Sequence, residues 1–120
     1  MAKIPRVAVV VPSYERPRAL ARCLESLRAQ TYRDFEVRVL QEKGPLAQIR
    51  NQGWRQADAE IVSFIDDDVW CPPMWLAAVV RVFNAGVVQG VTGPAVIHPK
   101  LRPRRDLFRW PGLTRWYERA

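Results

Sequence analysis

A chain of 120 residues, 48% of them apolar, is long enough to fold as one domain around its own core and too apolar to be disordered. The first apolar run is too short to cross a bilayer and lacks the flanking pattern of a signal peptide, so we expect a cytoplasmic protein. The two cysteines, Cys23 and Cys71, match no metal-ligand spacing and are too few for a disulfide framework, so we expect buried or half-buried thiols.

The net charge of +7 is concentrated toward the C-terminus. Residues 99–120 hold seven basic and two acidic side chains, a net charge of +5, interleaved with apolar and aromatic residues. We therefore predict a domain over residues 1–98 and a basic, aromatic-rich tail over 99–120. The tail suits an anionic membrane surface or nucleic acid. A solvated basic face that packs on something outside this chain is the alternative.

The first half of the domain predicts a strand, a helix and a second strand. Residues 7–11 are an unbroken apolar run, typical of a strand buried on both faces. Residues 16–30 place apolar side chains at helical spacing, with Ser13 or Glu15 available near the helix cap. Residues 35–40 alternate apolar and polar side chains, which indicates a strand nearer the edge of a sheet.

The second half predicts helices over 46–57 and about 75–83 and strands over 61–65 and about 87–91. Pro72 and Pro73 are tolerated at a helix start, so we place them at the beginning of the second of these helices. The resulting βαβαβαβ order predicts an α/β fold with a mostly parallel sheet and flanking helices. The carboxyl ends of parallel strands meet at one edge, where open α/β sheets bind ligands.

Three carboxylates follow the third strand directly, Asp66, Asp67 and Asp68, and no lysine or arginine lies near them in the sequence. Like charges at a buried strand end repel one another and lose hydration, so a compensating partner is expected. Along an extended backbone Asp66 and Asp68 point the same way and can converge on one point, while Asp67 faces elsewhere. Their oxygens are suitable ligands for an Mg²⁺ or Mn²⁺ ion that also coordinates a diphosphate. The alternative is a solvated acidic turn in which Asp66 caps the next helix.

Two more loops are predicted at the same edge. After the first strand, VVPSYERP offers backbone groups of Pro12 and Ser13 and the ring of Tyr14 to frame a flat heterocycle. After the second strand, GPLAQIRNQGW places Arg50 on a short helix, where its planar guanidinium can reach a phosphate or a base. The three loops together supply an aromatic platform, a cation and an acid pair for a metal.

With these segments in place, the sequence resembles the donor-binding half of a family 2 glycosyltransferase of the GT-A fold, a nucleotide-diphospho-sugar transferase. The resemblance covers residues 7 to about 98. It implies an inverting, hexosyltransferase-type enzyme that transfers a sugar from a nucleotide-diphosphate sugar, above all a UDP-sugar, to a glycan, lipid or protein acceptor. The segments that carry it are VAVVVPSYERPRALARCLESLRAQTYRDFEVRVL, GPLAQIRNQGWRQADAEIVSFIDDDV and PPMWL.

The resemblance also implies roles for the residues at the sheet edge. Asp66 to Asp68 match the DxD motif of the family, with Asp68 as the direct ligand of Mg²⁺ or Mn²⁺. Asp66 and Asp67 would contact the ribose or the shell of the metal, with Asp66 a further candidate ligand. Arg50 would lie near the base and the phosphates. The nucleoside pocket would be lined by Pro12, Ser13, Tyr14 and Glu15.

The sequence departs from the family in two places. An Asp-Asp-Gly-Ser-like turn usually follows the second strand and reads the base, whereas this chain has the turn 41–44, QEKG, and a shortened segment after it. An inverting transfer also needs a general base, which the family takes from its acceptor-binding half. We therefore assign no base here, and neither His98 nor the acids of the tail is proposed.

Three hypotheses follow. The first is a metal-dependent glycosyltransferase present as its donor-binding half. The second is a truncated GT-A-like module that binds a nucleotide without catalysing transfer. The third is a protein that associates with a membrane or nucleic acid through its tail, with the α/β domain as a scaffold. Of these two partners we expect peripheral contact of residues 99–120 with the inner face of the membrane and no nucleic acid. The sequence leaves the donor base, the sugar, the acceptor and the oligomeric state open.

Overall fold

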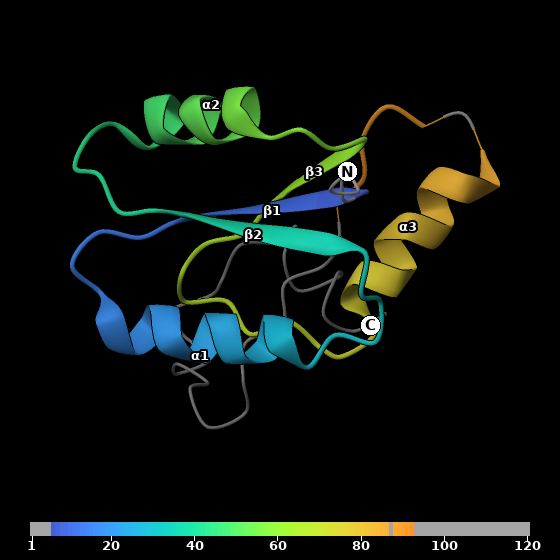
Figure 1. The fold of residues 1–120 in the computed structure, drawn as a ribbon, viewed down its shortest axis with the longest axis horizontal. Coiled ribbons are helices and arrows are strands. Elements are labelled where there is room, and N and C mark those ends of the chain that lie inside the picture. Colours follow the sequence, from blue (N-terminus) through green and yellow to red (C-terminus); the bar gives the residue numbers. More distant parts are fainter. Residues whose placement is uncertain (1–5, 87, 93–120) are drawn as a thin grey trace, which may run out of the picture. The chain divides into compact units, whose positions relative to one another are not determined.

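The computed structural model describes residues 6–86 and 88–92 (Figure 1). Its helices and strands all lie in one compact unit, Met1–Gly86. The six elements predicted before residue 87 are confirmed, and together they make the predicted α/β fold. In chain order they are β1 (Val7–Pro12), α1 (Pro17–Arg28), β2 (Phe35–Leu40), α2 (Leu46–Gln56), β3 (Ile61–Phe64) and α3 (Trp75–Ala85).

The three strands form a parallel sheet in the order β2-β1-β3. Val7 pairs with Phe35 on one side and with Ile61 on the other, so the strands start level with one another. The central strand is β1, and its unbroken apolar run is buried on both faces as predicted. The alternating strand β2 lies at an edge. Because all strands run the same way, the loops that leave their carboxyl ends meet at one edge of the sheet.

The helices cover both faces of the sheet. Figure 1 shows α1 and α2 on opposite sides of the strands. On the α2 side, Gly53 lies against Val10, whose side chain points away from the main core. On the other side, α1 and α3 pack on the sheet and close the core. That core is formed by Val7, Val9, Val11, Leu20, Cys23, Leu27, Ile61, Ile65, Cys71, Leu76 and Val80.

Two predicted details of the helix starts are wrong, the side-chain cap of α1 and the placement of Pro72 and Pro73 in α3. No side chain caps α1: its N-cap residue is Arg16, and Glu15 before it has a φ of 51°. The two prolines lie outside α3, because the backbone N–H of Trp75 donates to the carbonyl of Pro72 at 3.0 Å and closes a turn there. Proline lacks an N–H and disfavours helical geometry in the residue before it, so consecutive prolines suit a turn better than a helix.

The predicted fourth strand is not formed in the part of the chain that the structure describes. Residues 88–92 carry no strand, and Val88 and Val91 are exposed. A strand needs a neighbouring ladder to satisfy its backbone groups, and among the described residues this run pairs with no other strand. Residue 87, His98, the predicted domain boundary after residue 98 and the basic tail lie outside the described residues. Within the described ranges, no helix combines the length and the apolar character that a membrane span requires.

Candidate functional site

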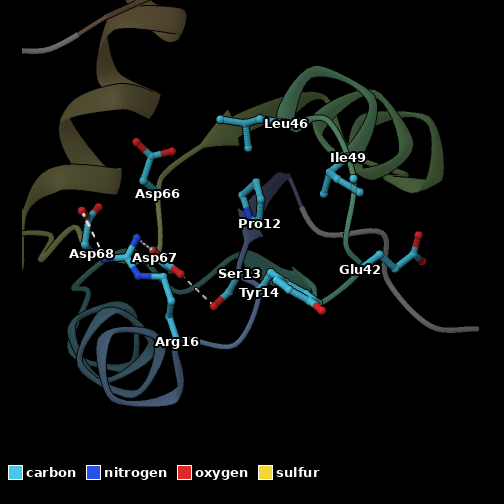
Figure 2. Close-up of a pocket in the computed structure, with 11 residues that line it drawn as sticks. Pro12, Ser13, Tyr14, Arg16, Glu42, Leu46, Ile49, Asp66, Asp67 and Asp68 are labelled. Carbon is cyan, nitrogen blue, oxygen red and sulfur yellow. Dashed lines mark hydrogen bonds and ion pairs between the residues drawn. The ribbon is translucent and has the colours of Figure 1, made fainter.

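Three loops at the carboxyl edge of the sheet enclose one pocket of about 340 Å³ (Figure 2). They are the loops that follow β1, β2 and β3, as the sequence predicted. Figure 2 shows the ring of Tyr14 and the carboxylate of Glu42 toward one end and the three aspartates toward the other. The pocket is lined by Pro12, Ser13, Tyr14, Arg16, Glu42, Gly44, Leu46, Ile49, Asp66, Asp67 and Asp68.

The loop after β1 joins the sheet to the pocket. The backbone N–H of Ser13 donates to the carbonyl of Leu40 at 2.9 Å and so extends the pairing of β1 with β2. At Glu15 the backbone enters the left-handed region, with φ at 51°, which side chains other than glycine, asparagine and aspartate rarely adopt. The chain turns sharply at this residue, and Arg16 after it lines the pocket. Tyr14 is 43% exposed, so part of its ring is free to contact a ligand.

Asp67 is the buried member of the acidic run, with only 4% of its surface exposed. One carboxylate oxygen accepts a hydrogen bond from the hydroxyl of Ser13 at 2.9 Å. The other lies 3.0 Å from a guanidinium nitrogen of Arg16. A buried carboxylate is costly unless it is paired and hydrogen-bonded, and here both conditions are met. These two contacts tie the loop after β3 to the loop after β1.

Asp66 and Asp68 are the exposed members, each with 57% of its side-chain surface in solvent. A nitrogen of Arg50 lies 3.0 Å from a carboxylate oxygen of Asp66, and a nitrogen of Arg16 lies 3.7 Å from one of Asp68. The sequence offers no nearby cation, yet the fold supplies a guanidinium to every carboxylate of the run. Exposed pairs of this kind are weak and exchange readily.

The backbone at the aspartates forms a turn. Ile65 makes the last hydrogen bond to β1, donating to the carbonyl of Val10 at 3.2 Å, and the N–H of Val69 then donates to the carbonyl of Asp66. The prediction that Asp67 faces away from Asp66 and Asp68 agrees with its burial, but the three residues lie in a turn and not along an extended strand. The alternative that Asp66 caps the next helix is wrong, because α3 begins only at Trp75 and no side chain caps it.

The loop after β2 contributes residues that the sequence analysis did not propose for the site. Glu42 and Gly44 line the pocket, and the amide of Gln52 donates to the carboxylate of Glu42 at 2.9 Å. Leu46 and Ile49, at the start of α2, supply an apolar wall. An acidic side chain in a loop at the carboxyl end of a parallel strand is a recognisable signal of a ligand site, and it would have singled out Glu42.

Six of the predicted site residues share the pocket, and two others do not line it. Glu15 forms the sharp turn before Arg16, and Arg50 reaches Asp66 from α2 without lining the pocket. Arg16 was missed, although it belongs to the same PSYERP segment. In the described residues, no group of three or more His, Cys, Asp or Glu side chains is arranged to hold a metal ion. The predicted residues in the pocket are Pro12, Ser13, Tyr14, Asp66, Asp67 and Asp68.

The turn formed by residues 66–69 is called the acidic turn below. The two cysteines lie next to it, Cys23 through its contact with the carbonyl of Asp66 and Cys71 by its place in the chain, and both are buried, as predicted. Burial raises the pKa of the Cys23 thiol to about 11, with smaller contributions from Cys71, Asp67 and Asp68. Burial also raises the pKa of Cys71 to about 11, against the opposing effect of its hydrogen bond with Ser26. Both groups are therefore neutral thiols at physiological pH and fill space in the core.

Comparison with known proteins places this chain in a family. The sequence matches the family described as Glycosyl transferase family 2 over residues 8–42 and 37–119. The chain belongs to glycosyl transferase family 2. The family predicted from the three loop segments is thereby confirmed.

Relatives in this family support the assignment over part of their length. An uncharacterized glycosyltransferase of Nostoc sp. (strain PCC 7120) is 31% identical over 114 residues, which cover 72% of this chain and 35% of that protein. EpsH of Bacillus subtilis (strain 168), also named as a glycosyltransferase, is 27% identical over 103 residues, which cover 64% of this chain and 30% of that protein. The chain thus spans about a third of the length of the curated relatives it matches.

Solved structures confirm the fold. The crystal structure of residues 1–349 of TarS from S. aureus matches with a TM-score of 0.59 and 19% identity, over 78% of this chain and 38% of that one. A second structure of S. aureus TarS matches with a TM-score of 0.58 and 20% identity, over 74% of this chain and 23% of that one. The predicted GT-A-type α/β fold is therefore the observed one.

Proposed function

We propose that this chain is the donor-binding half of a glycosyltransferase and holds a nucleotide-diphosphate sugar in the pocket at the sheet edge. The observation that carries the proposal is the composition of that one pocket. It joins a half-exposed aromatic ring and a guanidinium from the loop after β1 with two exposed carboxylates from the loop after β3, and Glu42 from the loop after β2 lines the same pocket. An aromatic platform for a base beside polar and charged groups for a diphosphate is the chemistry that such a ligand requires.

Each side chain has a proposed task. Tyr14 stacks on the nucleoside base, with Pro12 and Ser13 forming the adjoining wall. Arg16 donates to phosphate oxygens, since a guanidinium binds phosphate through two parallel hydrogen bonds. One guanidinium nitrogen of Arg16 stays paired with the buried Asp67, whereas the other faces the exposed Asp68 at 3.7 Å, so exchange of Asp68 for phosphate at that nitrogen has a small energetic cost.

The carboxylates fit a divalent ion by their chemistry. Asp66 and Asp68 present hard oxygen donors at the pocket, and Mg²⁺ or Mn²⁺ uses one or two carboxylates together with phosphate and water. We propose Asp68 as the direct ligand and Asp66 as the second. Such an ion, when bound, stabilises charge on the phosphate oxygens as the sugar leaves. Asp67 has both oxygens engaged by Ser13 and Arg16, so its task is to hold the two loops together.

Transfer to an acceptor is the wider proposal. An inverting transfer needs a general base within reach of the acceptor hydroxyl. No residue of the pocket is assigned to that task, and we propose that acceptor-binding residues beyond the pocket supply it. In that arrangement the pocket binds and orients the donor in the cytoplasm.

Calorimetric titration with UDP tests the proposal. The 120-residue chain is expected to bind UDP in the presence of Mn²⁺ and more weakly in its absence. Asp68→Ala is expected to lower the affinity measured with Mn²⁺ by about tenfold or more and to remove the effect of the metal. Asp58→Ala, an exposed acid in the loop before β3, is the matched control and is expected to bind as the unmodified chain does.

Two results would overturn the proposal. One is the absence of metal-dependent binding with both UDP and GDP. The other is equal metal-dependent binding by the Asp68 variant and the Asp58 variant, which would show that Asp68 is not the direct ligand of the ion.

A further inference from the structure

Two polar side chains are buried behind the acidic turn, on the side away from the pocket. Ser26, in α1, is 3% exposed, and Gln30, just after α1, is 2% exposed. Both face the segment 71–76, which connects the acidic turn to α3. Burying polar side chains opposes folding unless their hydrogen bonds are made, so their partners show what these residues do.

Gln30 satisfies backbone groups of that segment. Its amide nitrogen donates to the carbonyls of Pro72 at 2.7 Å, Cys71 at 3.4 Å and Ser26 at 3.2 Å. Its amide oxygen accepts from the N–H of Leu76 at 3.0 Å. Three carbonyls face one end and an N–H the other, so only this orientation of the amide fits.

Ser26 also binds the segment 71–76, and the hydrogen bonds of Gln30 and Ser26 to this segment are together called the clamp below. Its hydroxyl accepts from the N–H of Cys71 at 3.0 Å and donates to the carbonyl of Cys23 at 2.7 Å. The thiol of Cys23 in turn lies 3.7 Å from the carbonyl of Asp66. Apolar side chains could fill the same space but would leave these buried backbone groups without partners.

The clamp fixes one end of the acidic turn, and the sheet fixes the other. Ile65 is held by its hydrogen bond to Val10, and Cys71 is held by Ser26 and Gln30. The five residues between these anchors include all three aspartates. With both anchors in place, a span this short leaves the backbone of the three aspartates little freedom to move.

We propose that Ser26 and Gln30 are positioning residues that set the placement of Asp66 and Asp68 in the pocket. They touch no ligand and act through the backbone of the segment 71–76. The expected effect on nucleotide affinity rests on the proposed function. The expected effect on the backbone of the acidic turn rests on the hydrogen bonds of Ser26 and Gln30 alone. Groups that orient metal-binding carboxylates in this way typically change metal affinity by tenfold or more when they are removed.

The test uses variants that remove the clamp and one that lowers stability elsewhere. Gln30→Met keeps the length of the side chain but has no strong hydrogen-bonding atoms, and Ser26→Ala removes the hydroxyl. Ser26→Thr keeps the hydroxyl and is expected to retain the affinity for UDP in the presence of Mn²⁺. Val7→Ala is the control, because Val7 is a buried core residue at the opposite end of β1.

Two measurements on the full chain distinguish a positioning role of Ser26 and Gln30 from a general loss of stability. Titration with UDP and Mn²⁺ is expected to show about a tenfold loss of affinity for Gln30→Met and Ser26→Ala, and less than a twofold loss for Ser26→Thr and Val7→Ala. Amide hydrogen exchange at Val69, measured without ligand, is expected to be at least tenfold faster in Gln30→Met and Ser26→Ala than in Val7→Ala. In Ser26→Thr it is expected to equal the rate in Val7→Ala.

The two measurements fail in different ways. If the unmodified chain binds neither UDP nor GDP, the proposed function is wrong, and hydrogen exchange at Val69 still decides the positioning role. If exchange at Val69 and nucleotide affinity change no more in Gln30→Met than in Val7→Ala, the positioning role is wrong.

Discussion

At the scale of single residues, the pair formed by Arg16 and Asp67 differs from the pair formed by Arg50 and Asp66. Asp67 is buried, and its carboxylate relies on Arg16 and Ser13 for compensation. Replacing Arg16 by Met leaves that carboxylate with one hydrogen bond and no countercharge. Because Arg16 itself is more than half exposed and water screens the pair, we expect the free energy of unfolding to fall by about 1–2 kcal/mol in urea denaturation.

Arg50→Met is the control for that measurement. In the pair between Arg50 and Asp66 the carboxylate is exposed and the arginine is only half-buried, so removal of the pair is expected to change the free energy of unfolding by about 0.5 kcal/mol or less. Equal losses for the two arginine variants would show that the burial of Asp67 does not make its partner important.

The contact between Ser13 and Asp67 also shows why the site was only partly predictable. These residues lie 54 positions apart in the chain. Only the pairing of β1 with β3 brings the loop after β1, which holds Ser13, next to the loop after β3, which holds Asp67. Residue types at strand ends identified Ser13 and the aspartates, since that signal is local. The guanidinium partner of each carboxylate depends on side-chain directions across loops, about which a local pattern carries no information.

At the scale of elements, α2 packs on β1 through Gly53. A Cβ atom at this position would lie 2.4 Å from a methyl carbon of Val10 and 2.9 Å from one of Leu40. Gly53→Ala therefore forces the helix away from the sheet, at an expected cost of about 1–3 kcal/mol. The better helix propensity of alanine offsets only about 1 kcal/mol of that cost. Thermal unfolding is expected to show a lower midpoint temperature for this variant.

Gly86 provides the matched glycine. It ends α3 with an extended φ of −173°, and a Cβ atom there would meet nothing within 4 Å. Gly86→Ala is expected to change the free energy of unfolding by about 0.5 kcal/mol or less. If Gly53→Ala were equally neutral, the close approach of α2 to β1 would not be a tight contact.

The elements themselves were predictable because their signals are periodic and local. The apolar run of β1 predicted a strand buried on both faces, and the alternation of β2 predicted an edge strand, which is half-buried along its whole length. The turns before α1 and α3 were not predictable in this way, since the turn at Glu15 and the turn closed by Pro72 follow from how the chain leaves the sheet. The run at 88–92 shows the limit of patterns, because a strand also requires a partner to pair with.

At the scale of the whole molecule, one core joins α1, α3 and the sheet, and both cysteines belong to it. Burial raises the pKa of Cys23 and of Cys71 from the usual 9.0 to about 11. In the unfolded chain these thiols ionise near pH 9, whereas in the folded chain they remain neutral to about pH 11. The stabilisation is therefore complete below pH 9 and is lost as the pH rises from 9 through 11.

The pH dependence of unfolding tests this account of the core. Between pH 8 and pH 11 each thiol is expected to lower the free energy of unfolding by about 2 kcal/mol, from the size of its pKa change. The variant Cys23→Ala/Cys71→Ala is expected to be less stable at pH 8, because two small cavities are created, but to lose less stability on going to pH 11. Urea denaturation at both pH values gives the two differences, and other groups that titrate in this range cancel between the proteins. Parallel losses in the two proteins would mean that the thiols ionise as easily in the core as in water.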